Sequence, residues 1–304
     1  MKLCIASHVV LDEIINLDGK NTESLGGPVC YGSLLSKTFN FKAMPATKVG
    51  SDIFEKKSKE LRSCNINLEQ NQIDPHNPTT RFRLISKKGG GRELFLLSRC
   101  SPIEAVDVHD SDGFVISPVI DEISPDTLSQ IINREKNKFI MVDPQGFLRT
   151  VKDNGTVTNR SYREMNLNGV TAIKADEEEL SALTGGTTSI EGMKILKSKY
   201  KLDFIISTSE NNIIFLHKNI VYSIVIKKIE SPDHTGLGDI LATGFSCAYL
   251  KEKDPLWAIC FAAGSVITAL QSKMRGIGKI PTSIKLIERN STYFYNTVKF
   301  KIID

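Results

Sequence analysis

Short apolar runs alternate with longer amphipathic segments along most of the chain. The apolar runs are rich in β-branched and aromatic residues, and the segments between them carry apolar residues at helical spacing. This alternation is typical of βαβ units, and it predicts an α/β fold with a mostly parallel central sheet covered by helices on both faces. No internal repeat or low-complexity linker interrupts the pattern, so we expect residues 1–304 to form one main domain. The expected strands are Leu3–Ala6, Phe114–Ile116, Phe139–Val142, Ala172–Ile173 and Phe204–Ser207, and the expected helices are Tyr31–Thr38, Ile53–Ser63, Pro125–Arg134, Glu177–Leu183 and Ile190–Lys199.

Two segments break the alternation and have the pattern of antiparallel hairpins. Val9–Glu23 (VVLDEIINLDGKNTE) contains Asp18-Gly19, a strong signal for a two-residue hairpin turn. Thr80–Ser98 (TRFRLISKKGGGRELFLLS) has the pattern of a strand, a glycine turn and a second strand. The two hairpins, about residues 9–24 and 78–100, could pair into a small β lid over the carboxyl edge of the main sheet, where open α/β folds bind ligands. They could equally extend the edge of the main sheet, and the pattern leaves both arrangements open.

Composition and charge exclude several classes of function. The net charge of +4, from 39 basic and 35 acidic residues, is too small to indicate nucleic-acid binding, and the basic residues are scattered. The first residues, MKLCIASHVV, lack the features of a signal peptide, and the longest apolar run, Leu256–Leu270, is shorter than a bilayer span, so we expect a buried helix there. None of the six cysteines is in a CxxC pair, which argues against a zinc site, and a chain of this length needs no disulfide framework. We therefore expect a cytoplasmic protein with reduced thiols that binds neither nucleic acid nor a membrane.

The stretch SPDHTGLGDILATGF, at Ser231–Phe245, places a glycine-rich corner before a helix expected at Ile240–Leu250. Gly236 and Gly238 permit unusual backbone conformations and close approach of a ligand. The first N–H groups of the helix have no partner within it and lie at the positive end of its dipole, so the corner is a candidate phosphate site. Asp239 lies in the first helical turn, where we expect the dipole to keep its carboxylate ionised. A carboxylate repels phosphate, but it can take a proton from a hydroxyl group that attacks a phosphoryl group.

The alternative is an ordinary N-cap turn in which Asp239 only complements the helix dipole. No other segment has the pattern of a phosphate loop, because GxxxxGK[ST] is absent. The run Gly89–Gly91 lies in a predicted hairpin turn, and the glycines at Gly276–Gly278 lack the spacing of a dinucleotide fingerprint.

Several motifs, in the right order over nearly the whole chain, resemble those of the PfkB (ribokinase-like) carbohydrate kinases. DHTGLGD is similar to their DTxGAGD signature, LGGPVCYGS to their early Gly-Gly segment, and KADEEEL to their Asn-x-x-Glu segment. IISTSENN takes the place of their nucleotide loop, and the two hairpins take the place of their substrate lid. The motifs SHVVLDEI, SRCSPIE and DPQGFLR most resemble an archaeal group that includes myo-inositol kinases.

The resemblance implies roles for the residues of the corner. Asp239 would be the catalytic base, and the backbone N–H groups of Gly236, Leu237 and Gly238 would form the anion hole for the transferring phosphoryl group.

It also implies a nucleotide site and a metal that the protein holds indirectly. Glu179, with Asp176, would hold the water shell of a Mg²⁺ ion bound to ATP. Ser207, Thr208 and Ser209 would line the nucleotide site.

On the acceptor side, Asp12, Gly26 and Gly27 would meet the hydroxyl groups of the substrate, and Gln145 and Arg149 would face the same cleft. A carboxylate such as Asp12 suits vicinal hydroxyls because it accepts two hydrogen bonds in fixed geometry.

Some residues depart from the family pattern. His234 stands where the family has threonine, and we expect a structural or solvent-facing role for it. Leu237 replaces an alanine without affecting its N–H group, whereas Ser209 and Asn212 replace the two glycines of the nucleotide loop, which leaves the choice of donor nucleotide open. Tyr31 could face the acceptor or be a core aromatic.

Together these observations favour a kinase that uses ATP and Mg²⁺ to phosphorylate a hydroxyl of a sugar or cyclitol, such as a myo-inositol-like acceptor. A nucleoside kinase is one alternative, and a non-catalytic sugar- or nucleotide-binding protein is another. The resemblance also implies that the protein could be a homodimer through the lid. The need for a monovalent cation stays open.

Overall fold

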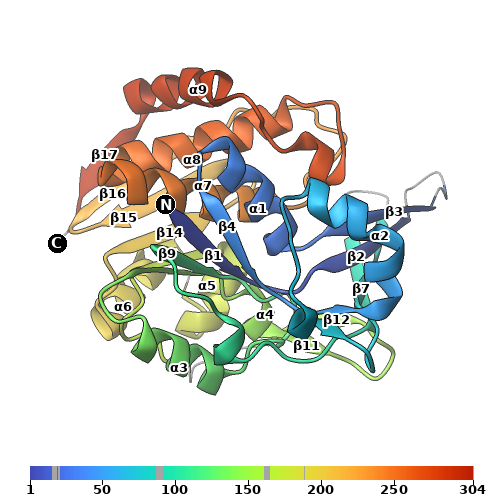
Figure 1. Ribbon diagram of the computed structural model, residues 1–304. Helices are drawn as coiled ribbons and strands as arrows, with labels where there is room; N and C mark the ends of the chain where they lie inside the picture. The colour runs from blue at the N-terminus through green and yellow to red at the C-terminus, as the bar shows by residue number, and fades with distance from the viewer. Residues whose placement is uncertain (16–18, 20, 87–91, 161–164, 188, 304) are drawn as a thin grey trace.

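The computed structural model describes residues 1–15, 19, 21–86, 92–160, 165–187 and 189–303. Within these residues, nine strands form the main sheet, in the order β17-β16-β15-β14-β13-β10-β9-β1-β4 (Figure 1). The six strands from β14 to β4 are parallel, and the three at the other edge are antiparallel. The bounds are β1 (Lys2–Ala6), β4 (Lys42–Ala46), β9 (Gly113–Ile116), β10 (Phe139–Val142), β13 (Ala172–Asp176), β14 (Phe204–Thr208), β15 (Asn212–His217), β16 (Ile220–Val225) and β17 (Lys299–Ile302).

Helices cover both faces of this sheet, as the sequence predicts (Figure 1). One face packs against α1 (Pro28–Thr38), α7 (Leu237–Glu252) and α8 (Pro255–Leu270), with α9 (Ile284–Thr297) outside α8. The other face packs against α3 (Pro125–Arg134), α5 (Glu177–Thr184) and α6 (Ser189–Tyr200). The expected α/β fold class is confirmed, with a mostly parallel sheet between two helical layers.

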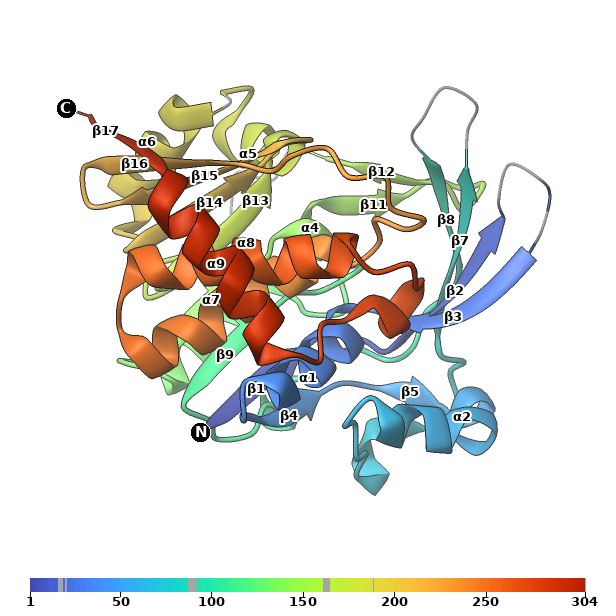
Figure 2. The ribbon, with the colours of Figure 1, turned by 90° about the horizontal axis from the view of Figure 1, so that it is seen from above.

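The two hairpins form a separate sheet and do not extend the main one. The order of its strands is β3-β2-β7-β8, with bounds β2 (Val10–Ile15), β3 (Asn21–Gly26), β7 (Thr80–Ser86) and β8 (Arg92–Ser98). Each hairpin is antiparallel, and the two join through a parallel pairing of β2 with β7. Figure 2 shows this small sheet projecting at one end of the molecule. Its role as a lid stays a prediction, and the turns expected at Asp18-Gly19 and 89–91 include residues outside those described.

One face of the small sheet is apolar. Val10, Phe82 and Leu84 pack there with Val119 and Ile120 from the loop after β9. The sheet is braced by the short strands β11 (Arg149–Val151) and β12 (Val157–Asn159), because the N–H of Leu96 on β8 donates to the Gly155 carbonyl at 2.9 Å. The apolar face therefore turns toward the body of the protein.

The remaining elements are short or lie outside the core layers. The helix α2 (Ser51–Ser63) lies beside the small sheet, and α4 (Gln145–Leu148) follows β10 (Figure 2). The strands β5 (Val49–Gly50) and β6 (Ile73–Asp74) form a two-stranded sheet, and η1 (Gln70–Gln72), η2 (Ala105–Asp107) and η3 (Gly276–Lys279) are single 3₁₀ turns.

Two expectations about apolar segments and cysteines can be compared with the structure. The run at 256–270 is the buried helix α8, as predicted, and no helix among the described residues is both long and apolar enough to cross a bilayer. All six cysteines, which lie in the described part of the chain, are buried free thiols.

Candidate active site

The glycine corner begins α7, one turn earlier than the sequence predicted. Gly236 is the N-cap residue and has φ 73°, a left-handed conformation that favours glycine. The first hydrogen bond of the helix runs from the Ile240 N–H to the Gly236 carbonyl at 3.0 Å. The N–H groups at positions 236–239 precede that bond and have no partner within the helix, so they can bind an anion.

Asp233 anchors the corner to η3. Its carboxylate accepts the N–H of Thr235 at 2.8 Å and the N–H of Gly276 at 2.7 Å. It also pairs with the ammonium of Lys279 at 2.9 Å, and the Lys279 side chain is 0% exposed. Burial alone would raise the pKa of Asp233, but Lys279 and the two N–H donors lower it to about 2. A fixed negative charge therefore holds the corner in place at any physiological pH.

Tyr31 lies under the corner, between Asp12 and the start of α7. A β-carbon at Gly236 would stand 2.5 Å from Cε1 and Cζ of the Tyr31 ring. A β-carbon at Gly26 would stand 2.6 Å from Oδ2 of Asp12. Tyr31 is buried, and burial raises its pKa, with further increases from Asp233, Asp12 and Asp239. The residues predicted for the corner (Gly236 and Asp239) and those predicted for the acceptor (Asp12, Gly26 and Tyr31) therefore lie in one place, and Tyr31 is also a core aromatic.

Asp239 does not have the ionisation that we expected from the helix dipole. Burial raises the pKa of its carboxyl, the nearby carboxylates of Asp143 and Asp12 add to this shift, and the resulting pKa is about 7. Lys174 and Arg149 oppose this shift. Asp239 is thus partly protonated near neutral pH, because desolvation outweighs the dipole, and a group with a pKa near the working pH is well suited to general-base catalysis.

Lys174 and Asp143 are two buried charges beside Asp239 that we did not single out as site residues. The ammonium of Lys174, on β13, is 3.0 Å from Oδ2 of Asp143, which follows β10, and 3.8 Å from Oε2 of Glu179. A β-carbon at Gly238 would stand 3.0 Å from this ammonium. Gly238 therefore lets the buried cation lie close to the N–H groups at the start of α7. Asp143 directly follows the carboxyl end of β10, a signal that could have identified it, whereas Lys174 lies in the middle of β13.

Glu179 and Asp176 form a capping box at the start of α5. The N–H of Asp176 donates to Oε2 of Glu179 at 2.8 Å, and the N–H of Glu179 donates to Oδ1 of Asp176 at 2.8 Å. Glu179 is buried, and burial raises its pKa, whereas the charge of Lys174 lowers it. Asp176 is partly exposed at the end of β13.

Gln145 and Arg149 lie at the two ends of α4. The N–H of Gln145 donates to Oδ1 of Asp143 at 3.2 Å. Arg149 donates from Nη1 to the Val119 carbonyl at 2.8 Å, and its guanidinium lies over the Phe82 ring, 6.0 Å from the centroid. Arg149 also lowers the pKa of Asp239. It therefore connects the apolar face of the small sheet with the corner.

A cavity of about 540 Å³ opens on the other side of α7. Thr208 and Ser209, at the end of β14, line it, but Ser207 does not and is buried within the strand. That Ser207, Thr208 and Ser209 line a nucleotide site stays a prediction, and of the three only Thr208 and Ser209 face this cavity. Much of the wall is apolar, from Ile213, Ile226, Ile229, Leu241, Val266 and Leu270.

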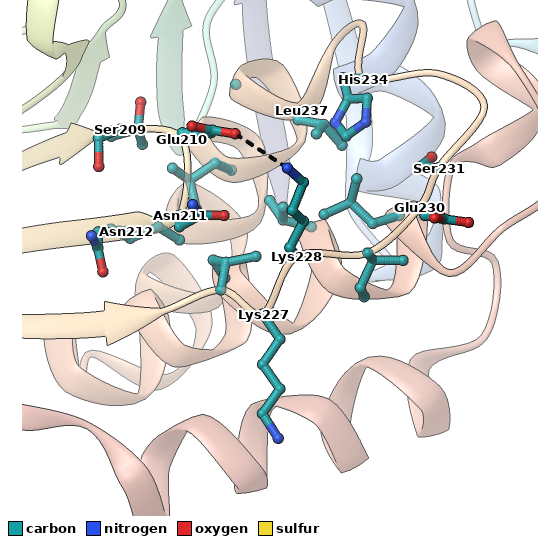
Figure 3. A pocket seen from close by; sticks show the side chains of 18 residues that line it. Ser209, Glu210, Asn211, Asn212, Lys227, Lys228, Glu230, Ser231, His234 and Leu237 are labelled. Carbon is teal, nitrogen blue, oxygen red and sulfur yellow. Dashed lines mark ion pairs between the residues drawn. The ribbon is translucent and has the colours of Figure 1, made fainter.

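Figure 3 shows the charged groups at the mouth of this cavity. Lys228 points toward Glu210, at 4.0 Å, whereas Lys227 points away, over the ring of Tyr293 on α9. His234 is exposed and lines the cavity near Leu237, in agreement with the solvent-facing position that we expected.

A second cavity, of about 410 Å³, lies between the small sheet and the corner. Ile14, Ser24 and Leu84 line it from the sheet, and His234 and Arg275 line it from the body. The corner thus has one cavity on each side, and His234 contributes to both.

The donor set favours a metal ion held through the substrate rather than by the protein alone. Among the described residues, no group of three or more His, Cys, Asp or Glu side chains could hold a metal ion. Asp143 and Glu179 are buried and share the one ammonium of Lys174, whereas Asp176 is partly exposed. Mg²⁺ keeps several waters and commonly binds substrate phosphates with one or two carboxylates, so these residues fit it only in that mode.

The chain is similar to kinases of one family over most of its length. The sequence profile described as pfkB family carbohydrate kinase matches residues 32–280. A cytidine kinase from Thermococcus kodakarensis is 25% identical over 260 residues, covering 83% of this chain and 90% of that protein.

Two solved structures share the fold. One is a pyrophosphate-dependent myo-inositol-1 kinase converted into a myo-inositol-3 kinase (TM-score 0.79, 24% identity, 96% of this chain and 99% of that chain). The other is an Arabidopsis thaliana ribokinase complexed with ribose and ATP (TM-score 0.72, 15% identity, 95% and 98%). The chain therefore belongs to the pfkB family of carbohydrate kinases and is a phosphotransferase that acts on a hydroxyl acceptor.

Proposed function

We propose that this enzyme transfers the γ-phosphoryl group of ATP to a hydroxyl of a sugar or cyclitol, with Asp239 as the general base. The observation that carries the proposal is the position of the Asp239 carboxyl. It lies in the first turn of α7, directly after corner residues that line the two cavities, and its pKa is raised to about 7. A carboxylate with that pKa can accept the proton of an attacking hydroxyl near neutral pH.

The start of α7 would stabilise the phosphoryl group during transfer. The N–H groups of Gly236, Leu237 and Gly238 would surround its oxygens, and the ammonium of Lys174 would add a positive charge beneath Gly238. Mg²⁺ on the donor phosphates would supply further charge neutralisation, with Asp176 and Glu179 ordering its water shell. Phosphoryl transfer depends mainly on such alignment and neutralisation, because the protein forms no covalent bond with the group.

The acceptor would lie on the Tyr31 side of the corner. Asp12 and the backbone of Gly26 and Gly27 would bind its hydroxyl groups, and Gln145 and Arg149 would complete the cleft. The small sheet would act as a lid that excludes water, which otherwise competes with the acceptor for the phosphoryl group. We also propose that the protein forms a homodimer through this sheet. A monomeric mass measured by light scattering would contradict the homodimer.

The 540 Å³ cavity favours a nucleotide as the donor over inorganic pyrophosphate. Its apolar wall suits a nucleobase, whereas a pyrophosphate ion could use only the polar and charged groups that also line the cavity. The loop before β15 also tolerates the loss of both family glycines, because none of its residues 209–212 has a positive φ. The pyrophosphate-dependent structural relative makes this comparison necessary.

The first experiment is an assay of phosphoryl transfer by the purified protein with Mg²⁺. ATP and pyrophosphate would each be tested against myo-inositol, ribose, fructose, 2-keto-3-deoxygluconate, adenosine, cytidine and inosine, with Asp239→Asn as the control. We expect turnover with ATP and one sugar or cyclitol, and none in the variant. Turnover with pyrophosphate alone would overturn the donor assignment.

A nucleoside kinase is the second candidate, and the 410 Å³ cavity favours it. Ile14 and Leu84 could pack on a nucleobase there, and Arg275 and Ser24 could bond to its edge. The cytidine kinase relative points the same way. Turnover of cytidine, adenosine or inosine with no response to free sugars would establish this candidate.

The other alternative is a non-catalytic sugar- or nucleotide-binding protein, which has no need for a base. Binding of ligand without any turnover is the result that would support it.

A further inference from the structure

All four strands of the small sheet connect to the main body at His8. This residue lies in the link from β1 to β2, and Thr80 is the first residue of β7. Ser101 follows β8 closely, and Gly27 follows β3. These four chain segments, distant in sequence, meet at one residue that is 0% exposed: Thr80 and Ser101 contact its ring, and Gly27 contacts its backbone.

The hydrogen bonds of His8 define its protonation. Nε2 lies 2.9 Å from the carbonyl oxygen of Ser101, and Nδ1 lies 2.7 Å from Oγ1 of Thr80. A carbonyl only accepts, so Nε2 carries the proton, and Nδ1 accepts the hydroxyl hydrogen of Thr80. Oγ1 of Thr80 then accepts the N–H of Cys100 at 3.0 Å. These bonds fit a neutral imidazole with its proton on Nε2, and burial lowers the pKa of His8 in that direction.

The backbone of His8 is held as firmly as its ring. A β-carbon at Gly27, which has φ 84°, would stand 2.5 Å from the His8 carbonyl oxygen, so β3 and α1 join directly against it. The N–H of His8 donates to the buried carboxylate of Glu122 at 3.1 Å.

Glu122 extends this network to the candidate site. It accepts the N–H groups of Val119, at 2.8 Å, and Ile120, at 2.7 Å. The carbonyl of Val119 in turn accepts from Arg149 at 2.8 Å. An unbroken chain of hydrogen bonds thus leads from His8 to a residue that affects the pKa of Asp239.

We propose that His8 is a positioning residue that sets the orientation of the small sheet over the acceptor site. The inference rests on the proposed function, because it assigns Asp12 and Gly26 to the acceptor. Asp12 lies four residues after His8 on β2, and Gly26 directly precedes Gly27. A change in the His8 contacts therefore displaces the acceptor-binding groups relative to Asp239, and leaves the donor cavity on the far side of α7 unchanged.

The experiment uses the full chain and compares His8→Gln, Thr80→Val and the double variant, with Thr80→Ser as the matched control. Glutamine can still donate to the Ser101 carbonyl but loses the bond to Thr80. Valine removes the Thr80 hydroxyl, and serine keeps it. Initial-rate kinetics would use the acceptor and donor that the phosphoryl-transfer assay identifies. Hydrogen exchange of the backbone amides would be measured without substrate.

We expect His8→Gln and Thr80→Val each to raise the KM for the acceptor roughly tenfold or more, because small displacements of positioning groups are costly. The KM for the donor should change less than about twofold. Amides of β2 and β7 should exchange faster, and those of β9 and β10 should not. The double variant should be no worse than Thr80→Val alone, because that variant already loses the bond to His8 together with the bond from the Cys100 N–H. Thr80→Ser should resemble the wild type.

Two results would overturn the inference. One is exchange of β2 and β7 at the wild-type rate in both variants. The other is a lower melting temperature with unchanged acceptor KM, which would make His8 only structural. Since hydrogen exchange needs no substrate, it tests His8 even if the wild type phosphorylates none of the acceptors, a result that would count against the proposed function alone.

Discussion

Gly236 lies directly against the aromatic ring of Tyr31, so closely that a β-carbon at position 236 would stand 2.5 Å from two ring atoms. This contact joins the start of α7 to α1, and it sets the distance between the proposed anion hole and the proposed acceptor site.

We expect Gly236→Ala to lower kcat roughly 10²-fold or more, because the N–H groups of the corner would shift from the phosphoryl group. It should also destabilise the fold by about 1–3 kcal/mol, through the clash and the left-handed φ. Gly186→Ala is the matched control, because Gly186 has φ 100° with nothing within 4 Å of a β-carbon. Enzyme assays and urea unfolding would measure both effects. Equal effects in the two variants would show that backbone strain alone is responsible and that the Tyr31 contact is unimportant.

Asp239→Asn should reduce kcat by about 10²–10⁴-fold, the range for loss of a general base. For the wild type, kcat/KM should rise with pH through about 7, because Asp239 must lose its proton to act as a base. Asp126→Asn, an exposed aspartate in the first turn of α3, controls for the loss of a dipole-complementing charge. A profile of kcat/KM that is flat from about pH 5 to about pH 9 would contradict the role of Asp239.

The same pKa shift predicts how stability depends on pH. The pKa of Asp239 in the folded protein is raised from 3.8 to about 7, so its stabilising contribution is present at low pH and is lost as the pH rises through about 7. Asp239→Asn should therefore be more stable than the wild type near pH 8 and nearly equal to it near pH 4, since the amide never ionises. Melting temperatures at both values would test this. A destabilised variant at high pH would mean that other contacts hold the charged carboxylate.

Lys174→Met should destabilise the protein by about 3–5 kcal/mol, because it leaves the buried carboxylates of Asp143 and Glu179 without their cation. The loss should be larger near pH 8 than near pH 5, where those carboxylates can take up protons. Denaturant unfolding at the two pH values would measure it, with the exposed Lys285→Met as control. Adding Asp143→Asn should recover part of the loss. No recovery would argue that packing rather than charge explains the effect.

Ile229→Trp should fill part of the 540 Å³ cavity and raise the KM for ATP roughly tenfold or more, without raising the KM for the acceptor. Initial-rate kinetics would measure both constants. Ile195→Trp, at an exposed position of α6, is the control for the added aromatic surface. An unchanged KM for ATP would place the nucleotide elsewhere.

The local pattern of the chain was sufficient to predict most parallel strands and the helices that cover them. The helix α3, for example, begins and ends at the residues expected, because Ser124 caps it, Pro125 begins it and its apolar stripe is regular. The antiparallel part formed by β15, β16 and β17 was not predicted: β17 is an exposed edge strand with a weak pattern, but β15 (NIIFLH) and β16 (IVYSIV) have apolar, β-branched patterns that we did not assign.

Within the site, the sequence by itself determined the glycine corner, the carboxylate at its end and the order of motifs that indicate a kinase. These depend on local geometry: a left-handed glycine, a helix start and a side chain one turn later. Only the tertiary structure decided that Lys174 lies beneath Gly238, that Tyr31 supports Gly236 and that His8 joins four segments of chain. Each of these relationships joins residues that are far apart in sequence, and the pKa of Asp239 follows from them, because burial and neighbouring charges exist only once the sheet and helices have packed.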